Sequence, residues 1–154
     1  MSSIETPLTK LLNIQHPIML AGMASISNHE LAAAVSNAGG IGSFGGVQMS
    51  PNALRKEIKM CKELLKPGMP FGVDLLLPKV GDGARATNKD YTDGNLDQII
   101  DILIEEKVPL FISAVGVPPK YAGMKTKAPA TSPFILACSR RHILPFFYCL
   151  SLCS

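Results

Sequence analysis

The sequence contains no tryptophan, and aromatic residues make up only 6% of its 154 residues. A hydrophobic core built from this chain must therefore be mostly aliphatic. The sequence also lacks a strong charge of either sign, because the formal net charge is only +3. No stripe of basic residues is interleaved with aromatic ones, so we do not expect a nucleic-acid partner. With 47% hydrophobic residues, the chain has the composition of one ordinary globular domain.

Cysteine pairs with metal-ligand spacing are also missing. No CxxC pair occurs, and no cysteine and histidine have the spacing of a zinc site. Cys61 stands alone in the body of the chain, where a helical position predicts a small buried residue.

Targeting and membrane signals are missing as well. The first 27 residues show no signal-peptide pattern. No apolar run reaches the roughly 18–20 residues of a membrane span. The sequence therefore predicts an intracellular, cytoplasmic protein without a membrane span.

Short apolar runs alternate along the chain with amphipathic segments. We expect strands over residues 16–23, 41–45, 70–78 and 109–116. We expect helices over residues 31–38, from Ser50 to Lys66, and around 96–103. Apolar strands separated by amphipathic helices predict an α/β fold with a parallel sheet. The pattern alone leaves open whether that sheet is doubly wound or part of a barrel.

Several residues mark the expected helix ends. Ser27 and Glu30 have the spacing of a capping box before the first of these helices, and Gly39 lies where a helix end needs positive φ. Ser50 and Pro51 are typical of the next helix start.

The segment from Gly40 to Gly45 matches the pattern GxGxxG. A dinucleotide-binding fingerprint requires a strand before the motif and a helix opening inside it, whereas here a helix precedes it. Two other interpretations remain open. The glycines either permit a tight helix-to-strand turn or let a ligand approach the backbone closely.

Candidate binding residues lie at the expected carboxyl ends of strands, where parallel α/β folds bind ligands. Ala21, Gly22 and Met23 end the first expected strand, and small residues there leave room for a flat ring. Asp74 interrupts an apolar strand, so its charge should be paired or functional. Lys120 follows the fourth strand and either binds an anionic group or is solvated.

Four segments of the sequence resemble the nitronate monooxygenase family. They are PIMLAGMA from Pro17, LAAAVSNAGGIGSFGG from Leu31, FGVDL from Phe71 and SAVGVPPK from Ser113. The resemblance implies the N-terminal half of a (β/α)8 TIM barrel, an α/β fold, over residues 1–120, with a divergent irregular tail over 121–154. It does not separate this family from the related flavin-dependent enoyl reductases.

The resemblance also implies a cofactor and a reaction. FMN would oxidise a small-molecule alkyl nitronate, and the reduced flavin would be reoxidised by O2. In that picture Ala21, Gly22 and Met23 line the flavin ring, and Lys120 contacts the cofactor. Asp74 occupies a position where many relatives carry Asn.

The family's catalytic histidine lies in a later glycine-rich segment, and none of the three histidines here lies in such a segment. We therefore assign no catalytic residue and expect little or no turnover by this truncated chain alone. A non-catalytic half-barrel, which self-associates through open sheet edges, and an enoyl reductase fragment are the alternatives.

Overall fold

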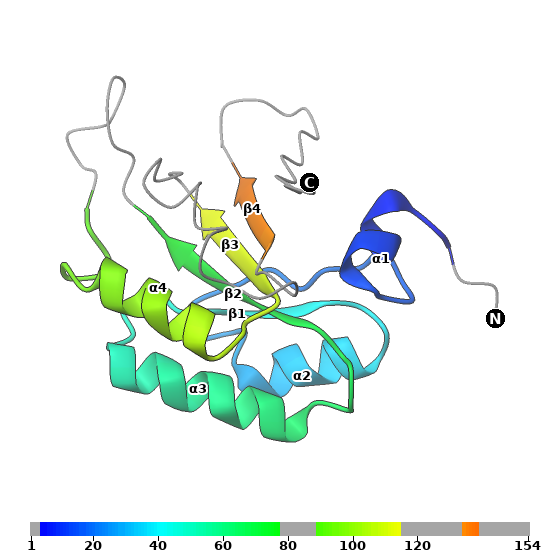
Figure 1. The fold of residues 1–154 in the computed structure, drawn as a ribbon, viewed down its shortest axis with the longest axis horizontal. Helices are drawn as coiled ribbons and strands as arrows, with labels where there is room; N and C mark the ends of the chain where they lie inside the picture. Colours follow the sequence, from blue (N-terminus) through cyan, green and yellow to red (C-terminus); the bar gives the residue numbers. More distant parts are fainter. Residues whose placement is uncertain (1–3, 78–88, 115–133, 139–154) are drawn as a thin grey trace.

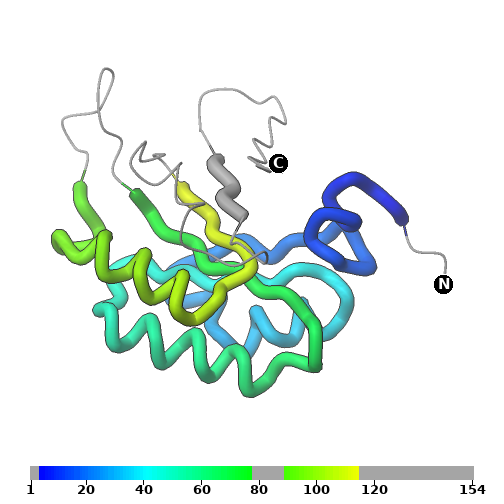
Figure 2. The backbone as a smooth tube through the Cα atoms, viewed as in Figure 1, coloured from blue at the N-terminus to red at the C-terminus, as the bar shows by residue number. Residues whose placement is uncertain are grey.

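The computed structural model describes residues 4–77, 89–114 and 134–138. In these residues the backbone passes repeatedly from helix to strand (Figures 1 and 2). The helices are α1 (Pro7–Leu12), α2 (His29–Asn37), α3 (Pro51–Leu64) and α4 (Leu96–Glu105). The strands are β1 (Gly42–Gly45), β2 (Phe71–Leu76), β3 (Leu110–Ala114) and β4 (Phe134–Cys138).

The strands form one parallel sheet in the order β1-β2-β3-β4, which is their order along the chain. At the β1 edge, Met19 forms a single parallel bridge to Ile41. The strand order never reverses, as it would at the switch point of a doubly wound sheet. Helices α2, α3 and α4 all lie on one side of the sheet (Figure 1). Both features are those of a TIM barrel, so the expected partial barrel is confirmed.

Three of the four expected strands form. Residues 41–45, 70–78 and 109–116 contain β1, β2 and β3. The first expected strand, 16–23, is reduced to the bridge between Met19 and Ile41.

One strand lies where we expected an irregular tail. Residues 134–138 form β4 and pair with β3 from Leu110↔Phe134 to Ala114↔Cys138. The run FILAC is short but continuously apolar, as parallel strands covered on both faces commonly are. The rest of the tail, 121–133 and 139–154, lies outside the described residues.

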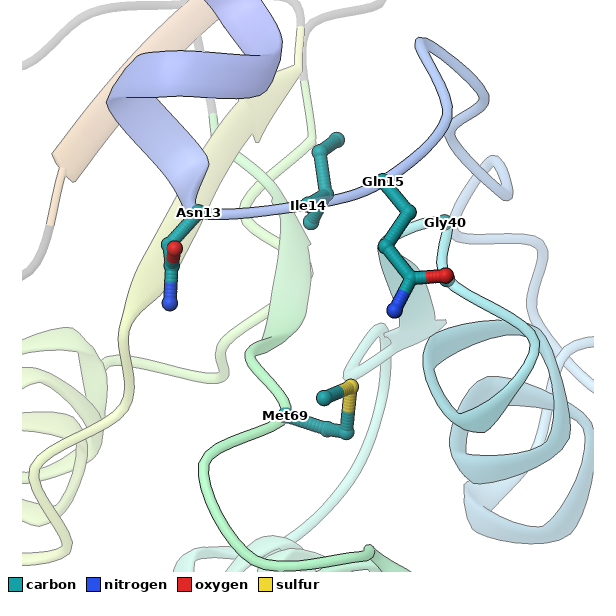
Figure 3. Close-up of a pocket in the computed structure, with 6 residues that line it drawn as sticks. Asn13, Ile14, Gln15, Gly40 and Met69 are labelled. Carbon is teal, nitrogen blue, oxygen red and sulfur yellow. The ribbon is translucent and has the colours of Figure 1, made fainter. Parts of the chain in front are cut away.

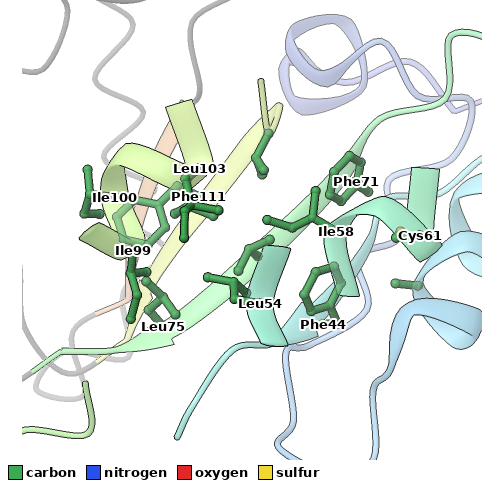
Figure 4. Packing of buried hydrophobic residues seen from close by; sticks show 14 of the residues in the cluster. Phe44, Leu54, Ile58, Cys61, Phe71, Leu75, Ile99, Ile100, Leu103 and Phe111 are labelled. Carbon is green, nitrogen blue, oxygen red and sulfur yellow. The ribbon is translucent and has the colours of Figure 1, made fainter. Parts of the chain in front are cut away.

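The main core lies between the sheet and helices α2, α3 and α4, and Figure 4 shows part of it. Phe44 of β1 stacks on Phe71 of β2, with ring centroids 6.4 Å apart. Most other members of this cluster are aliphatic, as the composition predicts. Cys61 is fully buried on α3, and burial raises the pKa of its thiol to about 12. Cys61 is therefore a packing residue, as expected.

A smaller cluster covers part of the opposite face of the sheet, which we call the interior face. Leu12 and Ile14, at the end of α1 and just after it, pack there with Ile41, Leu110 and Ile112. Side chains alternate between the two faces of a strand. Because Val73 and Leu75 of β2 belong to the helix-facing core, Asp74 faces the interior.

The expected helix ends are mostly confirmed. Ser50 caps α3 by accepting a hydrogen bond from the Ala53 N–H, and Gly39 follows α2 with φ +93°. The expected capping box at Ser27 is wrong. Asn28 caps α2, because the Ser27 hydroxyl instead bonds the N–H and C=O of Met23.

Polar side chains connect the helices to one another. Glu57 on α3 accepts hydrogen bonds from both the backbone N–H and the ring Nδ1 of His29. Glu106, just after α4, pairs with Arg55 and Lys62 of α3. These contacts hold α2, α3 and α4 in one layer.

Asn37, the last residue of α2, connects that helix to the end of α3. Its Nδ2 donates to the Leu64 carbonyl at 2.8 Å, and its Oδ1 accepts from the Lys66 N–H at 2.7 Å. Asn37→Ala should lower the free energy of unfolding by about 1–2 kcal/mol, because both hydrogen bonds are lost. Urea unfolding would measure the change. An unchanged urea midpoint for Asn37→Ala would contradict the prediction.

Candidate functional site

The segment after the Met19 bridge crosses the carboxyl ends of β1 and β2. A Cβ on Gly22 would overlap Asp74, lying 2.8 Å from Oδ2 and 2.9 Å from Cγ. A Cβ on Gly45, the last residue of β1, would lie 2.9 Å from the Ala24 nitrogen. The two glycines therefore let the 22–24 turn lie directly against β1 and β2. We call Gly22, Gly45 and Asp74 the carboxyl-edge cluster.

Local hydrogen bonds hold this turn in place. Ser27 Oγ accepts from the Met23 N–H and donates to the Met23 carbonyl. The Leu20 carbonyl accepts a short hydrogen bond from Ser43 Oγ of β1. The sequence did not indicate that Ser27 and Ser43 belong to this site. The four-residue spacing from Met23 to Ser27 was the only local signal for the first contact.

Asp74 is the unusual polar group of the cluster. In the described part of the chain, its Oδ1 is the one buried side-chain oxygen or nitrogen without a hydrogen-bond partner. Burial raises the pKa of this carboxyl to about 6. A buried polar atom without a partner is costly, so it marks a candidate ligand contact. The sequence allowed two roles for Asp74, a structural pair with another side chain or a contact with a ligand. No described side chain pairs with it.

This raised pKa predicts how stability changes with pH. The folded chain holds the Asp74 proton more tightly than the unfolded chain, whose ordinary value is 3.8. The stabilising contribution is therefore complete below about pH 4 and is lost as the pH rises through 6. Asp74→Asn should stabilise the chain by about 1–2 kcal/mol at pH 8, a value reduced for partial solvent access, and much less at pH 4.

Urea unfolding at the two pH values measures this difference. Asp101→Asn, on the exposed face of α4, is the matched control and should change little at either pH. An equal effect of Asp74→Asn at pH 4 and pH 8 would show that the pKa of the Asp74 carboxyl does not change on folding.

The structure brings together some of the predicted site residues. Gly22 contacts Asp74, as described above, and Ala21 and Met23 flank Gly22 with exposed side chains. Asp74 occupies the space into which a side chain at Gly22 would project, and the expected place of these three residues beside a ring stays a prediction. Lys120 lies outside the described residues.

The GxGxxG match is not a dinucleotide fingerprint, as expected. Gly40 follows α2, and β1 lies inside the motif instead of before it. Gly42 packs against the backbone of Ala32 in α2, and Gly45 against the 22–24 turn. The motif therefore serves close backbone packing on both faces of β1.

A shallow pocket lies at the other end of the sheet. It has a volume of about 190 Å3 and lies among Asn13, Gln15, Gly40 and Met69 (Figure 3). These residues precede β1 and β2, so the pocket opens at the amino edge, away from Asp74. Parallel α/β folds bind ligands at the carboxyl edge, so we place the candidate site at the carboxyl-edge cluster.

Two other kinds of site find no support in residues 4–77 and 89–114. No group of three or more histidine, cysteine or acidic side chains there could hold a metal ion. No helix in the same residues is long and apolar enough to cross a membrane.

A sequential parallel sheet, helices on one face and a glycine-lined carboxyl edge define the first part of a TIM-barrel enzyme. The model of the family described as nitronate monooxygenase matches residues 5–138. The chain therefore belongs to the nitronate monooxygenase family, a family of flavin-dependent oxidoreductases. The match extends beyond Lys120, where we expected the resemblance to stop, and includes β4.

Individual relatives agree with this assignment. The chain is 32% identical over 136 residues to a "Probable nitronate monooxygenase" of Staphylococcus saprophyticus, covering 75% of this chain and 38% of that protein. A counterpart in Staphylococcus aureus is 25% identical, with 79% and 39% coverage. The chain thus spans about two fifths of the length of these relatives.

Solved structures support the fold. FabK from Thermotoga maritima is similar with a TM-score of 0.68 and 35% identity, over 88% of this chain and 37% of that one. Nitroalkane oxidase from Streptomyces ansochromogenes gives a TM-score of 0.65 and 25% identity, over 86% and 42%. Both are TIM-barrel enzymes, so the described sheet corresponds to part of a barrel.

Proposed function

We propose that this chain carries part of the site for FMN-dependent oxidation of alkyl nitronates with O2. The observation that supports it most is the buried Asp74 Oδ1, which has no partner at the carboxyl edge of a sheet from this family. A flavin has both N–H and carbonyl groups on its polar edge, so it can supply the missing hydrogen bond. The residues present therefore fit the cofactor.

In this proposal the chain's own residues bind and orient the flavin. Ala21, Gly22 and Met23 lie along the ring, Asp74 meets its polar edge, and Lys120 contacts the cofactor. Ser27 holds Met23 in position through two hydrogen bonds, so the turn is set before the ligand arrives. When bound, FMN supplies the chemistry that takes electrons from the nitronate and passes them to O2.

The test separates binding from turnover. We expect the purified chain to bind FMN, with an absorption band at about 450 nm, the usual mark of an oxidised flavin. We expect little oxidation of propyl-2-nitronate, followed as O2 consumption, because the match covers only 38% of the probable nitronate monooxygenase of Staphylococcus saprophyticus. A folded chain that binds no flavin at any concentration would contradict the proposal, and full turnover would contradict the expected impairment.

A flavin-dependent enoyl reductase is the second candidate. The 35% identity to FabK of Thermotoga maritima favours it. This candidate predicts NAD(P)H oxidation with an enoyl thioester and no reaction with a nitronate, so two parallel assays distinguish them.

A non-catalytic half-barrel is the remaining alternative. The two described histidines offer no free acid or base at the carboxyl-edge cluster, because His16 precedes the Met19 bridge and His29 is paired with Glu57. Self-association through the open sheet edges belongs to this alternative. It predicts a concentration-dependent mass in sedimentation, without flavin.

A further inference from the structure

The Asp74 carboxyl faces uncharged groups on every described element packed against it. The turn contributes the Gly22 backbone, β1 contributes Gly45, and β3 contributes Ile112, the register partner of Asp74. None of the ion pairs in the described part of the chain includes Asp74, and burial raises the pKa of its carboxyl. The carboxyl therefore has neither a counterion nor a hydrogen bond to Oδ1 to stabilise its charged form.

A flavin bound at this edge would also favour the protonated form of the Asp74 carboxyl over the charged form. A protonated carboxyl can donate and accept hydrogen bonds, whereas a carboxylate can only accept. The polar edge of a flavin presents one N–H among several acceptor oxygens and nitrogens, and a carboxylate that met any of these acceptors would be repelled by it. The ring would also exclude the remaining water from Asp74, which makes the negative charge still more costly.

We propose that Asp74 couples flavin binding to proton uptake, so that the chain binds flavin with this carboxyl protonated and releases it as the carboxyl ionises. The inference rests on the proposed function, because it requires a flavin at the carboxyl-edge cluster. It is specific to a chain with aspartate at position 74, since an amide there could not titrate.

Flavin affinity measured against pH tests the coupling. The probe is riboflavin, because the second phosphate ionisation of FMN falls near pH 6 and would obscure the result. Quenching of riboflavin fluorescence gives the dissociation constant between pH 5 and pH 8 for the wild-type chain, Asp74→Asn and the control Asp101→Asn. We expect the wild-type and Asp101→Asn constants to rise at least about tenfold over this range, and that of Asp74→Asn to change less than twofold.

The possible results separate the coupling to proton uptake from the proposed flavin site. Binding by all three chains with the same pH dependence overturns the inference and leaves the proposed flavin site intact. Folded chains that bind no riboflavin and no FMN at any pH overturn both.

A second measurement needs no variant. Carbon-13 NMR of the wild-type chain follows the Asp74 carboxyl directly, with and without riboflavin. Because binding and proton uptake are linked, the titration midpoint should move to higher pH when riboflavin is bound. A midpoint that stays in place or moves to lower pH overturns the inference even if Asp74→Asn fails to fold.

Discussion

Gly42→Ala should lower the free energy of unfolding by at least about 3 kcal/mol, at or above the upper end of ordinary overpacking effects. A Cβ at this position would overlap the carbonyl group of Ala32 in α2 and lie 2.6 Å from the Ala32 Cα. The atoms in its way belong to a helix backbone, so no side-chain rotation can relieve the overlap. Helix α2 would have to move away from β1.

Gly72→Ala is the matched control for this change. It lies on the neighbouring strand and also faces close neighbours, but these are Leu110 Cδ2 at 3.1 Å and Ser43 Cβ at 3.2 Å. A flexible leucine can yield by a few tenths of an ångström, so we expect a loss below about 1.5 kcal/mol. Urea unfolding curves of the two variants, compared with wild type, measure both values. Similar losses for the two would show that the contact with α2 is not tight.

Gly22→Ala should have the second large effect, and it should change both the free energy of unfolding and the affinity for flavin. The added Cβ would overlap Asp74 at the base of its side chain, where a rotamer change cannot relieve the clash. We expect a loss of about 2–3 kcal/mol in the free energy of unfolding. We also expect flavin affinity to fall at least tenfold, because the 22–24 turn must lift from β2.

A double variant separates steric overlap from other causes. Asp74→Gly removes the side chain that the new Cβ meets, so Gly22→Ala should cost much less in the Asp74→Gly background. The coupling between the two positions should exceed about 1 kcal/mol in a double-mutant cycle. Additive effects would mean that Gly22 is required for another reason. Ala24→Gly, in the same turn, is a control for added backbone freedom.

Much of the fold could be predicted because the information is local. Apolar runs and helix caps predicted β1, β2, β3 and the three longer helices. Helix α1 has only six residues, too few for an apolar period, and depends on the reciprocal contacts of Thr6 and Thr9 and on packing of Leu12. The adjacent sequence also did not show that Asn28, and not Ser27, caps α2. The Ser27 hydroxyl is instead hydrogen-bonded to Met23, four residues earlier.

The site was less predictable, since its parts lie far apart in sequence. Asp74 was noticeable as a charge in an apolar strand, and Gly22 as a small residue at a strand end. Nothing local indicates that the missing side chain of Gly22 accommodates Asp74, fifty-two positions later. The choice between a barrel and a doubly wound sheet depended likewise on strand order, which the helix and strand pattern does not contain.

The sequential strand order has a consequence for how the chain is assembled during translation. Each described strand after β1 pairs with the strand that precedes it in the sequence and is therefore synthesised before it. β1 alone is enough to set the register of β2. Domains generally fold from the N-terminus as synthesis proceeds. A nascent sheet of this kind always presents the edge that the next strand requires, so it can grow in the order of its own codons.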